Sequence, residues 1–349
     1  MKAEGNLTNQ SELRDIVDEF PNNVSLAFGY GSGVFAQTNH VVEESELPMI
    51  DLIFSTSSPK EWHEKNLKRY SDHYGLIPRY GGARFIEALN KWGAGVYFNP
   101  MVEVGSARKR LIKYGVIDDE TLKRDLKEWD SMYIAGRLHK PTLLLNTANG
   151  DEILELQEKY NLRYALSTAL LLLSDEKHQI QNKRIEVGDI FESIASLSYI
   201  GDPRFAAGAE DPKKVKKLVH SAGQLDRFRT VYREQYQSLE EMGILTINEN
   251  VIEMNLMDTS TRRSLYERLP PRLQYEMRSS FHQASPESEK EVSPLKIQET
   301  SKILTNSLAR IVGPPAKIQS VKGLVTAGVF KSVKYASAKL SKGVLKGIF

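Results

Sequence analysis

The chain has 349 residues, of which 40% are apolar and 26% are charged, and these ordinary proportions predict two globular domains with appendages rather than one domain. It contains no cysteine, which excludes disulfides, thiolate metal sites and cysteine nucleophiles. The formal net charge of +2 is uneven, because residues 301–349 carry nine basic residues and no acidic one. Such a basic end predicts binding to an anionic surface.

The first 147 residues predict an α/β domain. Apolar residues recur at helical spacing in residues 10–20, 59–70 and 121–133, where we expect helices. Buried strands are expected at residues 24–30, 49–55, 96–104, 110–117 and 142–146, since these runs are rich in apolar and β-branched residues. Strands mixed with helices predict a mixed sheet, and we place this domain at residues 1–147.

From residue 148 the pattern becomes helical. Helices are predicted at residues 151–160, 163–174, 188–199 and 212–240, and a hairpin is predicted over residues 244–254. Helices followed by a hairpin are consistent with a winged-helix-like domain, which we place at residues 148–282. Residues 283–300 have the composition of a solvated linker, and residues 301–349 form the basic tail.

A glycine-rich turn follows the strand predicted at residues 24–30. Gly31, Ser32 and Gly33 let the backbone turn sharply, so that consecutive N–H groups and the Ser32 hydroxyl can point at a polyphosphate. Asp51, inside the next predicted strand, is suited to hold Mg²⁺ against the same phosphate oxygens. The alternative is a tight turn that binds nothing.

Two familiar phosphate-binding patterns are disfavoured here. Residues 34–40 (VFAQTNH) do not open as a helix, which a dinucleotide-binding fingerprint requires, and no Gly-Lys-Ser/Thr of a Walker motif follows. A Gly-Ser turn followed by an acidic strand is instead the pattern of the DNA polymerase beta-like nucleotidyltransferases. Those enzymes usually carry a second carboxylate two residues on, where this chain has Ile53. A second metal ligand must therefore come from elsewhere, or one metal site is weak.

Seven segments together make the chain resemble one family, the Tam41/Mmp37 family of mitochondrial-type CDP-diacylglycerol synthases (phosphatidate cytidylyltransferases). They cover roughly residues 24–220 in order, and they are 28–35 (FGYGSGVF), 50–54 (IDLIF), 61–67 (EWHEKNL), 93–99 (GAGVYFN), 111–117 (LIKYGVI), 133–141 (YIAGRLHKP) and 197–204 (LSYIGDPR). The resemblance implies that CTP and phosphatidate react, with Mg²⁺, to give CDP-diacylglycerol and pyrophosphate. It also implies a nucleotidyltransferase domain joined to a winged-helix-like domain.

The matching segments nominate site residues. We expect Asp51, Ser32, Lys113 and Arg137 to act in catalysis, and Asp51 and Asp202 to bind the metal. The residues expected to bind the nucleotide and its phosphates are Tyr30, Gly31, Ser32, Gly33, Tyr97, Asn99, Lys140 and Arg204. A phosphate monoester is already ionised near neutral pH, so this chemistry needs cations and backbone donors rather than a strong general base.

Several of these residues have a plainer explanation. Lys113 and Arg137 are also explained by surface ion pairs, and Tyr97 by packing in the core. Asp202 stands in a Gly-Asp-Pro-Arg turn, where aspartate is common. His63 lacks metal-ligand spacing with other residues, so we expect it to make a structural hydrogen bond.

Residues 318–349 can be drawn as an amphipathic helix. Its apolar face is expected to lie on a bilayer with its lysines toward anionic headgroups, each contributing roughly 1 kcal/mol. The alternatives are a helix that docks on its own protein, or a basic arm that binds nucleic acid. No basic patch interleaved with aromatic residues indicates a nucleic-acid partner, and nothing in the sequence indicates an oligomeric state.

The sequence thus predicts a peripheral membrane phosphatidate cytidylyltransferase. We expect it on the cytoplasmic face of a bacterial membrane, or on the matrix face of the mitochondrial inner membrane if the chain is organellar. Two rival functions remain: a nucleotidyltransferase with a different acceptor, and a non-catalytic membrane-associated scaffold.

Overall fold

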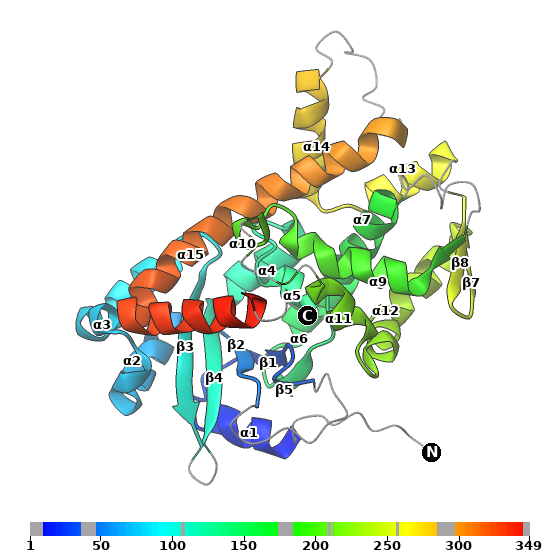
Figure 1. The fold of residues 1–349 in the computed structure, drawn as a ribbon. Helices are drawn as coiled ribbons and strands as arrows, with labels where there is room; N and C mark the ends of the chain where they lie inside the picture. The colour runs from blue at the N-terminus through cyan, green and yellow to red at the C-terminus, as the bar shows by residue number, and fades with distance from the viewer. Residues whose placement is uncertain are drawn as a thin grey trace.

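The computed structural model describes residues 10–35, 47–105, 109–173, 184–206, 208, 211, 213–255, 258–284 and 297–344. Its helices and strands pack around a five-stranded mixed sheet (Figure 1). Its strands are β1 (Leu26–Tyr30), β2 (Ile50–Thr56), β3 (Val96–Val104), β4 (Arg110–Asp118) and β5 (Leu143–Asn146). They lie in the order β3-β4-β2-β1-β5. Among these strands only the neighbours β2 and β4 are parallel, and the other neighbours are antiparallel. The predicted mixed α/β fold is confirmed.

Helices cover both faces of this sheet. Side chains alternate along β2, so that Ile53 joins the larger cluster on one face while Phe54 packs with Trp62 on the other. The Phe54 face is covered by α1 (Gln10–Asp18), α2 (Pro59–Arg69), the short η2 (Ser71–His73) and α3 (Leu76–Asn90). The Ile53 face is covered by α4 (Asp119–Glu128), α5 (Ala135–Leu138), α6 (Asp151–Leu156), the π-helix η3 (Gln157–Leu162) and α7 (Arg163–Leu173).

Helix α4 shows how local sequence sets an element's ends. The Asp118 carboxylate accepts a hydrogen bond from the Thr121 backbone N–H at 3.0 Å, which caps the helix start. Acidic residues in the first turn favour the positive end of the helix dipole. Trp129 ends the helix in a left-handed conformation with φ +60°. The predicted helix at residues 121–133 is therefore shorter, because the chain turns at Trp129.

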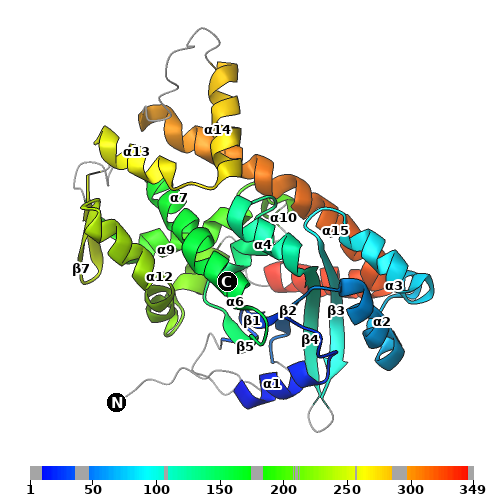
Figure 2. The same cartoon turned by 180° about the vertical axis from the view of Figure 1, so that it is seen from behind.

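The second half of the chain is mainly helical, with a small antiparallel sheet of three strands (Figure 2). Its strands are β6 (Arg184–Glu186), β7 (Leu245–Asn248) and β8 (Val251–Met254), and β7 and β8 form the predicted hairpin. Its helices are α9 (Val187–Ser196), η4 (Leu197–Tyr199), α10 (Pro203–Ala206), α11 (Lys214–His220), α12 (Gln224–Glu241), α13 (Thr259–Glu267) and α14 (Pro271–Ala284). The single helix predicted at residues 212–240 is wrong, because Gly223 has φ +72° and separates α11 from α12.

The last helix, α15 (Ile297–Val344), belongs largely to the body of the protein. Leu304, Leu308 and Ile311 are buried in the same core cluster as residues of β1 and α7. Further along, Lys322 is buried, and its Nζ donates hydrogen bonds to the backbone oxygens of Trp92 and Val96, both at 3.0 Å. A separate tail from residue 301 is therefore wrong for the stretch up to Thr326, which is also buried.

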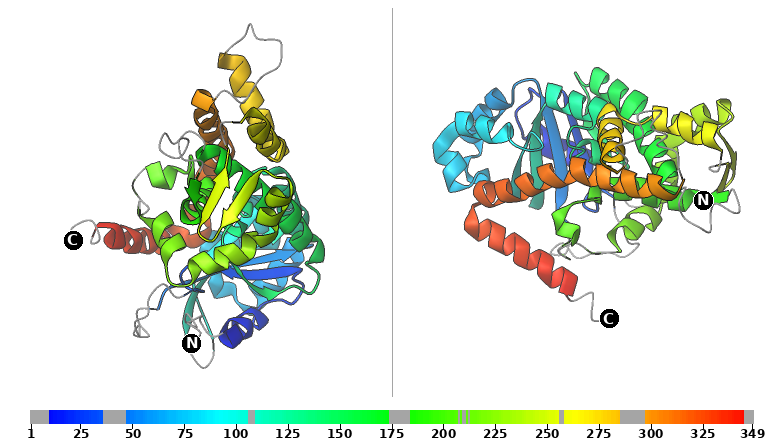
Figure 3. Two further views of the ribbon diagram at one scale, coloured as in Figure 1. Left: turned by 90° about the vertical axis from the view of Figure 1, so that its right-hand side faces the viewer. Right: turned by 90° about the horizontal axis from the view of Figure 1, so that it is seen from above.

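The distal part of α15, drawn in red, turns back and leaves the body close to α3 (Figure 3). The side chains of residues 327–344 lie outside the described part of the chain, so the amphipathic face expected there stays a prediction. Most of the linker expected at residues 283–300 also lies outside it. Among the described helices, none combines the length and the apolar character needed to cross a membrane.

Candidate active site

The glycine-rich turn after β1 packs directly on the start of β2. The N–H groups of Val34 and Phe35 donate to the Gly31 oxygen at 3.2 and 3.1 Å, which closes the turn. Gly31 has φ +79°, a conformation that glycine adopts without strain. A Cβ at Gly33 would lie 2.2 Å from the Met49 backbone oxygen, so only glycine allows this close approach. Ser32 is exposed at the apex of the turn.

Asp51 lies beside this turn, on β2. A Cβ at Gly31 would lie 3.7 Å from the Asp51 Oδ2, so a bare backbone faces the carboxylate. In the parallel pairing of β2 with β4, Asp51 stands opposite Lys113, and the Lys113 Nζ lies 3.4 Å from the Asp51 Oδ1. The Asp51 side chain retains 24% exposure. Turn, carboxylate and lysine thus meet at one edge of the sheet.

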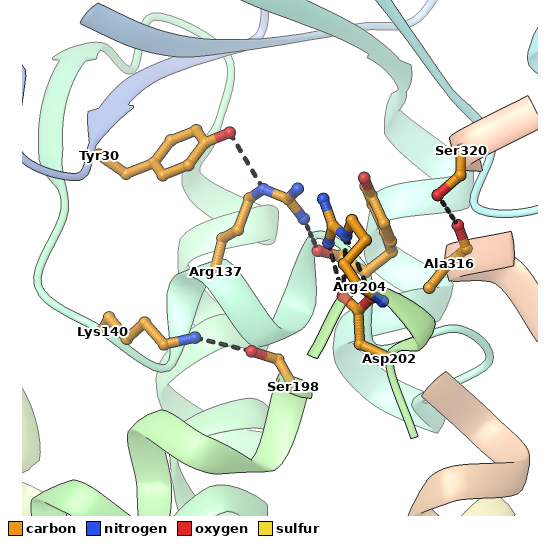
Figure 4. Close-up of polar contacts among 9 residues, drawn as sticks. Tyr30, Arg137, Lys140, Ser198, Asp202, Arg204, Ala316 and Ser320 are labelled. Atoms are coloured by element: carbon orange, nitrogen blue, oxygen red, sulfur yellow. Dashed lines mark hydrogen bonds and ion pairs between the residues drawn. The ribbon is translucent and has the colours of Figure 1, made fainter. Parts of the chain in front are cut away.

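Arg137 of α5 faces the same edge. Its Nε donates to the Tyr30 hydroxyl at 3.1 Å, and its guanidinium also donates to the Tyr133 backbone oxygen (Figure 4). The guanidinium carbon lies 4.2 Å from the centre of the Tyr133 ring and 5.7 Å from that of Phe98, which also lies 4.6 Å from the Lys113 Nζ. Aromatic faces therefore support both cations without neutralising them.

The charges of this edge act on its tyrosines. Burial, and then the charge of Asp51, raise the pKa of the Tyr30 hydroxyl. Burial also acts to raise the pKa of Tyr133, but the positive charges of Arg137, Arg204 and Lys113 outweigh it and lower that pKa below its usual value. The positive charges that act on Tyr133 would stabilise a bound anion in the same way.

A buried carboxylate fixes the backbone that carries Arg137. The Asp125 Oδ1 accepts from the N–H of Ser131 and of Met132, both at 2.8 Å, and its Oδ2 accepts from that of Ala135 at 3.0 Å. Asp125 thereby satisfies backbone donors at the start of the short helix α5, which has too few residues to be stable alone.

Buried amides bond to the carbonyl oxygens of α5. The Asn161 Nδ2 donates to the Ala135 oxygen at 3.0 Å, and the Gln157 Nε2 donates to the Leu138 oxygen at 2.6 Å. Both residues belong to the π-helix η3, and such bulges are frequent at functional sites. The Asn161 Oδ1 lies 2.9 Å from the His139 Nε2. Burial lowers the pKa of His139 to about 3, so this histidine is neutral.

Lys140 follows α5 and is held by uncharged oxygens. Its Nζ donates to the Ser198 Oγ at 2.7 Å and to the Gly136 oxygen at 2.8 Å, and it lies 4.6 Å from the centre of the Tyr199 ring. Burial, and then the charges of Arg137 and Lys214, lower the pKa of Lys140 well below its usual value. A bound anion would relieve this cost.

Asp202 and Arg204 form a close pair on a turn. The Arg204 Nη2 lies 2.6 Å from the Asp202 Oδ2, and the Arg204 backbone N–H donates to the Asp202 Oδ1 at 2.9 Å. Asp202 is buried, whereas the Arg204 side chain is 38% exposed. The aspartate thus both shapes the turn and orients the arginine.

These groups line a cavity of about 570 Å³ between the sheet edge, the segment 198–218 and α15. The size suits a small-molecule ligand. Its six cationic and three acidic side chains are Lys113, Arg137, Lys140, Arg204, Lys214, Lys217, Asp51, Asp202 and Asp211. Each acid lies in an ion pair with one of these cations, whereas Arg137 and Lys140 bond to uncharged oxygens. The cavity therefore carries excess positive charge, as an anion site requires.

The structure brings together most of the predicted site residues. Those that line the cavity are Tyr30, Gly31, Ser32, Asp51, Lys113, Arg137, Lys140, Asp202 and Arg204. Gly33 shapes the turn from outside the lining. Tyr97 and Asn99 are fully buried away from the cavity, and Asn99 donates to the Tyr114 hydroxyl at 2.7 Å. The reason is strand alternation, since Phe98 between them points toward the cations instead.

Sequence reasoning missed several lining residues. Ser198 and Tyr199 lie in the segment 197–204 that resembles the family, but nothing else in the sequence distinguishes them as site residues. Lys214 and Lys217 belong to the run KKVKK at residues 213–217, and this local concentration of lysine was the available signal. Tyr133 begins the matching segment 133–141, but its role depends on the turn that Asp125 holds and is not apparent from the sequence.

The donor set fits a magnesium ion. Mg²⁺ is often bound by one or two carboxylates plus substrate phosphates and water, and Asp51 supplies one partly exposed carboxylate beside the turn. Among the residues that the structure describes, no group of three or more His, Asp or Glu side chains could hold a metal without a ligand's help. The single Asp51 carboxylate beside the turn therefore fits an ion whose other ligands are phosphate oxygens and water.

Comparison with known proteins places the chain among relatives. A rat protein named "Phosphatidate cytidylyltransferase, mitochondrial" is 35% identical over 333 residues, covering 95% of this chain and 94% of the relative. Proteins of the same name from Schizosaccharomyces pombe and Saccharomyces cerevisiae are 33% and 29% identical, covering 96% of this chain in each case and 84% and 71% of the relatives.

A solved nucleotidyltransferase-like protein from Exiguobacterium sibiricum covers 91% of this chain and is covered to 75%, but its TM-score of 0.20 and identity of 9% are too low to support an argument. The profile of the family described as "Phosphatidate cytidylyltransferase, mitochondrial" matches residues 13–342. With a match over nearly its whole length and relatives above 30% identity, the chain belongs to this family.

Proposed function

We propose that the chain transfers the cytidylyl group of CTP to phosphatidate, giving CDP-diacylglycerol and pyrophosphate. The observation that carries this proposal is the excess positive charge of the cavity beside the Gly31–Gly33 turn, in a member of this family. Two substrates that each bear phosphate groups must meet there. Arg137, bonded to an uncharged oxygen, can turn its charge toward the phosphates, and bound phosphates would favour the charged form of Lys140, whose pKa burial lowers.

The reaction joins a phosphatidate oxygen to the α-phosphorus of CTP and breaks the bond from that phosphorus to the bridging oxygen of pyrophosphate. The phosphatidate monoester is largely ionised near neutral pH, with a second pKa of about 6, so no general base is needed. Ser32 and the glycine turn hold the triphosphate, while Lys113 and Arg137 balance the charge that develops on leaving pyrophosphate. Lys140 and Arg204 orient the remaining phosphate oxygens.

Asp51 is the proposed ligand of Mg²⁺, with Asp202 as the second candidate. Bound with the triphosphate, the ion would neutralise its negative charge and favour departure of pyrophosphate. Asp202 can contribute only by loosening its pair with Arg204, which lies 2.6 Å away. Asp51 is the better candidate because its ion pair is longer, at 3.4 Å, and its side chain is more exposed.

We propose that the two halves of the chain are two domains. We assign residues 1–147 to a DNA polymerase beta-like nucleotidyltransferase domain and residues 148–282 to a winged-helix-like domain, whose hairpin would be β7–β8. The main core cluster contains side chains of both, for example Phe28, Leu166 and Phe228. Substrates would bind between the two, where the cavity lies.

The lipid substrate places the reaction at a membrane surface. We propose that the distal part of α15 binds anionic lipid as a peripheral anchor, because residues 327–349 contain five lysines and no acidic residue. The membrane would be the cytoplasmic face of a bacterial membrane, or the matrix face of the mitochondrial inner membrane in an organelle.

The test is a product assay with labelled CTP and vesicles that contain phosphatidate. Label should enter the lipid extract in the presence of Mg²⁺, and Asp51→Asn should lower the rate by at least two orders of magnitude. Asp226→Asn is the matched control, since that carboxylate is exposed on α12. Label that stays aqueous contradicts the lipid acceptor, and a CTP titration that leaves the melting temperature unchanged would favour a non-catalytic scaffold.

A further inference from the structure

Exposed apolar side chains gather at one end of the molecule. Ten large apolar residues in the described part of the chain are exposed, and six of them belong to α3, the turn after it and α15. We call these six the apolar end, and they are Leu76, Ile77, Tyr80, Trp92, Ile318 and Val321. The views of Figures 1 and 2 agree that α3 and α15 lie side by side here. Such a concentration marks an interaction surface rather than chance exposure.

The start of α3 presents its apolar residues on one side. Gly82 has φ +68° and interrupts the helix, so residues 76–81 form a separate turn. Pro78 is buried and faces inward, whereas Leu76, Ile77 and Tyr80 are 69%, 59% and 86% exposed. Tyr80 follows Leu76 by four residues and Ile77 by three, and these spacings place side chains on one helix face. Three large side chains therefore project together with nothing covering them in the described structure.

The turn after α3 contacts α15. A Cβ at Gly93 would lie 2.8 Å from the Ile318 side chain, and the Lys322 Nζ donates to the Trp92 oxygen at 3.0 Å. Trp92 itself is 63% exposed. Its backbone is thus fixed while its indole points outward, as expected of an anchor residue. The basic distal part of α15 leaves the body at this same end (Figure 3).

The charges around the apolar end are mainly positive. Arg79, Arg84 and Lys91 of this region are exposed, and Glu87, which lies 3.9 Å from Lys91, is the one acidic residue of α3. In a two-fold dimer the surface would pack against itself and bring these cations close to one another, which is unfavourable. An anionic bilayer instead complements them, and Trp and Tyr favour the boundary between headgroups and acyl chains.

We propose that the apolar end is a second membrane-docking surface, on which Leu76, Ile77, Tyr80 and Trp92 enter the interface of an anionic bilayer while Arg79, Arg84 and Lys91 contact headgroups. This inference deepens the proposed function and rests on it, since a lipid acceptor requires the site to face a bilayer. Two contacts, the apolar end and the distal part of α15, would fix the orientation of the enzyme, whereas one would leave it free to tilt.

The three tryptophans provide a local reporter. Trp62 and Trp129 are fully buried, so Trp92 is the one exposed indole of the chain. The full-length protein is mixed with vesicles of phosphatidylcholine and phosphatidylglycerol, which are anionic but contain no substrate. Trp emission should shift to shorter wavelength and become sensitive to brominated acyl chains, and Trp92→Phe should abolish both effects. Bound protein whose emission does not change overturns the proposal.

Substitutions test the other anchors. The combined change Leu76→Ser, Ile77→Ser and Tyr80→Ser should weaken vesicle partitioning on the order of tenfold. The control is Tyr275→Ser on α14, which removes a comparably exposed tyrosine outside the apolar end (62% exposed) and should leave partitioning unchanged.

Cytidylyl transfer to a short-chain, water-soluble phosphatidate should be equal in all variants. Docking without transfer would refute only the proposed function, and transfer without docking only this inference. A patch variant that converts a dimer into a monomer would assign the surface to a second copy and overturn the proposal.

Discussion

Lys140 is a buried lysine whose protonation depends on what the cavity holds. Its pKa is lowered by burial and by neighbouring Arg137 and Lys214, which disfavours the charged form in the free protein. A bound triphosphate favours the charged form, so CTP binding should take up a proton. Affinity for CTP should therefore fall as the pH rises through the lowered pKa.

Calorimetry of CTP binding in two buffers of different ionisation enthalpy measures this proton uptake. The uptake should disappear in Lys140→Gln, and the variant should bind CTP with a shallower pH dependence. Lys123→Gln serves as a control, because that lysine pairs with Glu120 and Glu152 outside the cavity. An unchanged uptake in Lys140→Gln would move the titrating group elsewhere.

The face of β3 on which Asn99 lies could not be predicted from the sequence of that strand alone. The resemblance associates the segment around it with the nucleotide, but the sequence does not tell which of its two faces points toward the cavity, because alternation fixes only which residues share a face. Phe98 faces Lys113, while Asn99 and Tyr97 are buried behind the sheet. The Tyr114 hydroxyl there lies 2.7 Å from the Asn99 Nδ2 and 2.9 Å from the Asn66 Nδ2.

Asn99→Ala should therefore affect stability and not nucleotide binding. Loss of one buried hydrogen bond lowers the free energy of unfolding by about 1–3 kcal/mol, which urea denaturation measures. The KM for CTP should stay unchanged. A raised KM with normal stability would restore Asn99 to the nucleotide site.

At the scale of elements, α5 is a four-residue helix that carries Arg137 and depends on its surroundings. Asp125 accepts hydrogen bonds from the backbone at its start, at 2.8 to 3.3 Å. An amide at this position would turn an N–H donor toward backbone donors. Asp125→Asn should lower the free energy of unfolding by about 2–3 kcal/mol and reduce kcat through misplaced Arg137.

The neighbouring Asp130 supplies a matched control for that prediction. Asp130 is 44% exposed and pairs with Arg124, so Asp130→Asn should change stability by less than about 0.5 kcal/mol and leave kcat intact. Chemical denaturation and steady-state kinetics separate the two variants. Equal effects of both substitutions would remove Asp125 from the positioning of α5.

The elements themselves divide into those that the sequence predicts and those that it does not. All five strands of the main sheet and the β7–β8 hairpin were predicted, because long apolar runs and clear turns mark them. Helix α3 was missed, because Gly81 and Gly82 interrupt its pattern and its apolar side chains are exposed. The break between α11 and α12 was missed because one glycine, Gly223, causes it.

At the scale of the whole molecule, the cavity is assembled from parts that lie far apart in the sequence. Tyr30, Arg137 and Ser198 reach one cavity only because the two halves of the chain share a core. The resemblance identified the segments, and their phosphate chemistry selected most of the residues. Lys214 and Lys217 could not be placed in this way, since their contribution depends on how α11 packs.

Truncating helix α15 at two different positions should have different effects on the whole molecule. Removing residues 301–349 deletes Leu304, Leu308 and Ile311 from the core. Each buried leucine contributes several kcal/mol, and together they approach the 5–15 kcal/mol that stabilises a typical domain, so this truncated protein should fail to fold. Removing only residues 327–349 spares these side chains and the Lys322 hydrogen bonds to the Trp92 and Val96 oxygens.

The shorter truncation should therefore melt within a few degrees of the full chain and bind CTP normally. Its affinity for anionic vesicles should fall, and the remaining affinity should depend less on salt, because the last five lysines are gone. Differential scanning calorimetry and vesicle sedimentation at two salt concentrations measure both effects. Vesicle binding that is unchanged in strength and in salt dependence would mean that the body alone, through the apolar end, holds the enzyme on the membrane.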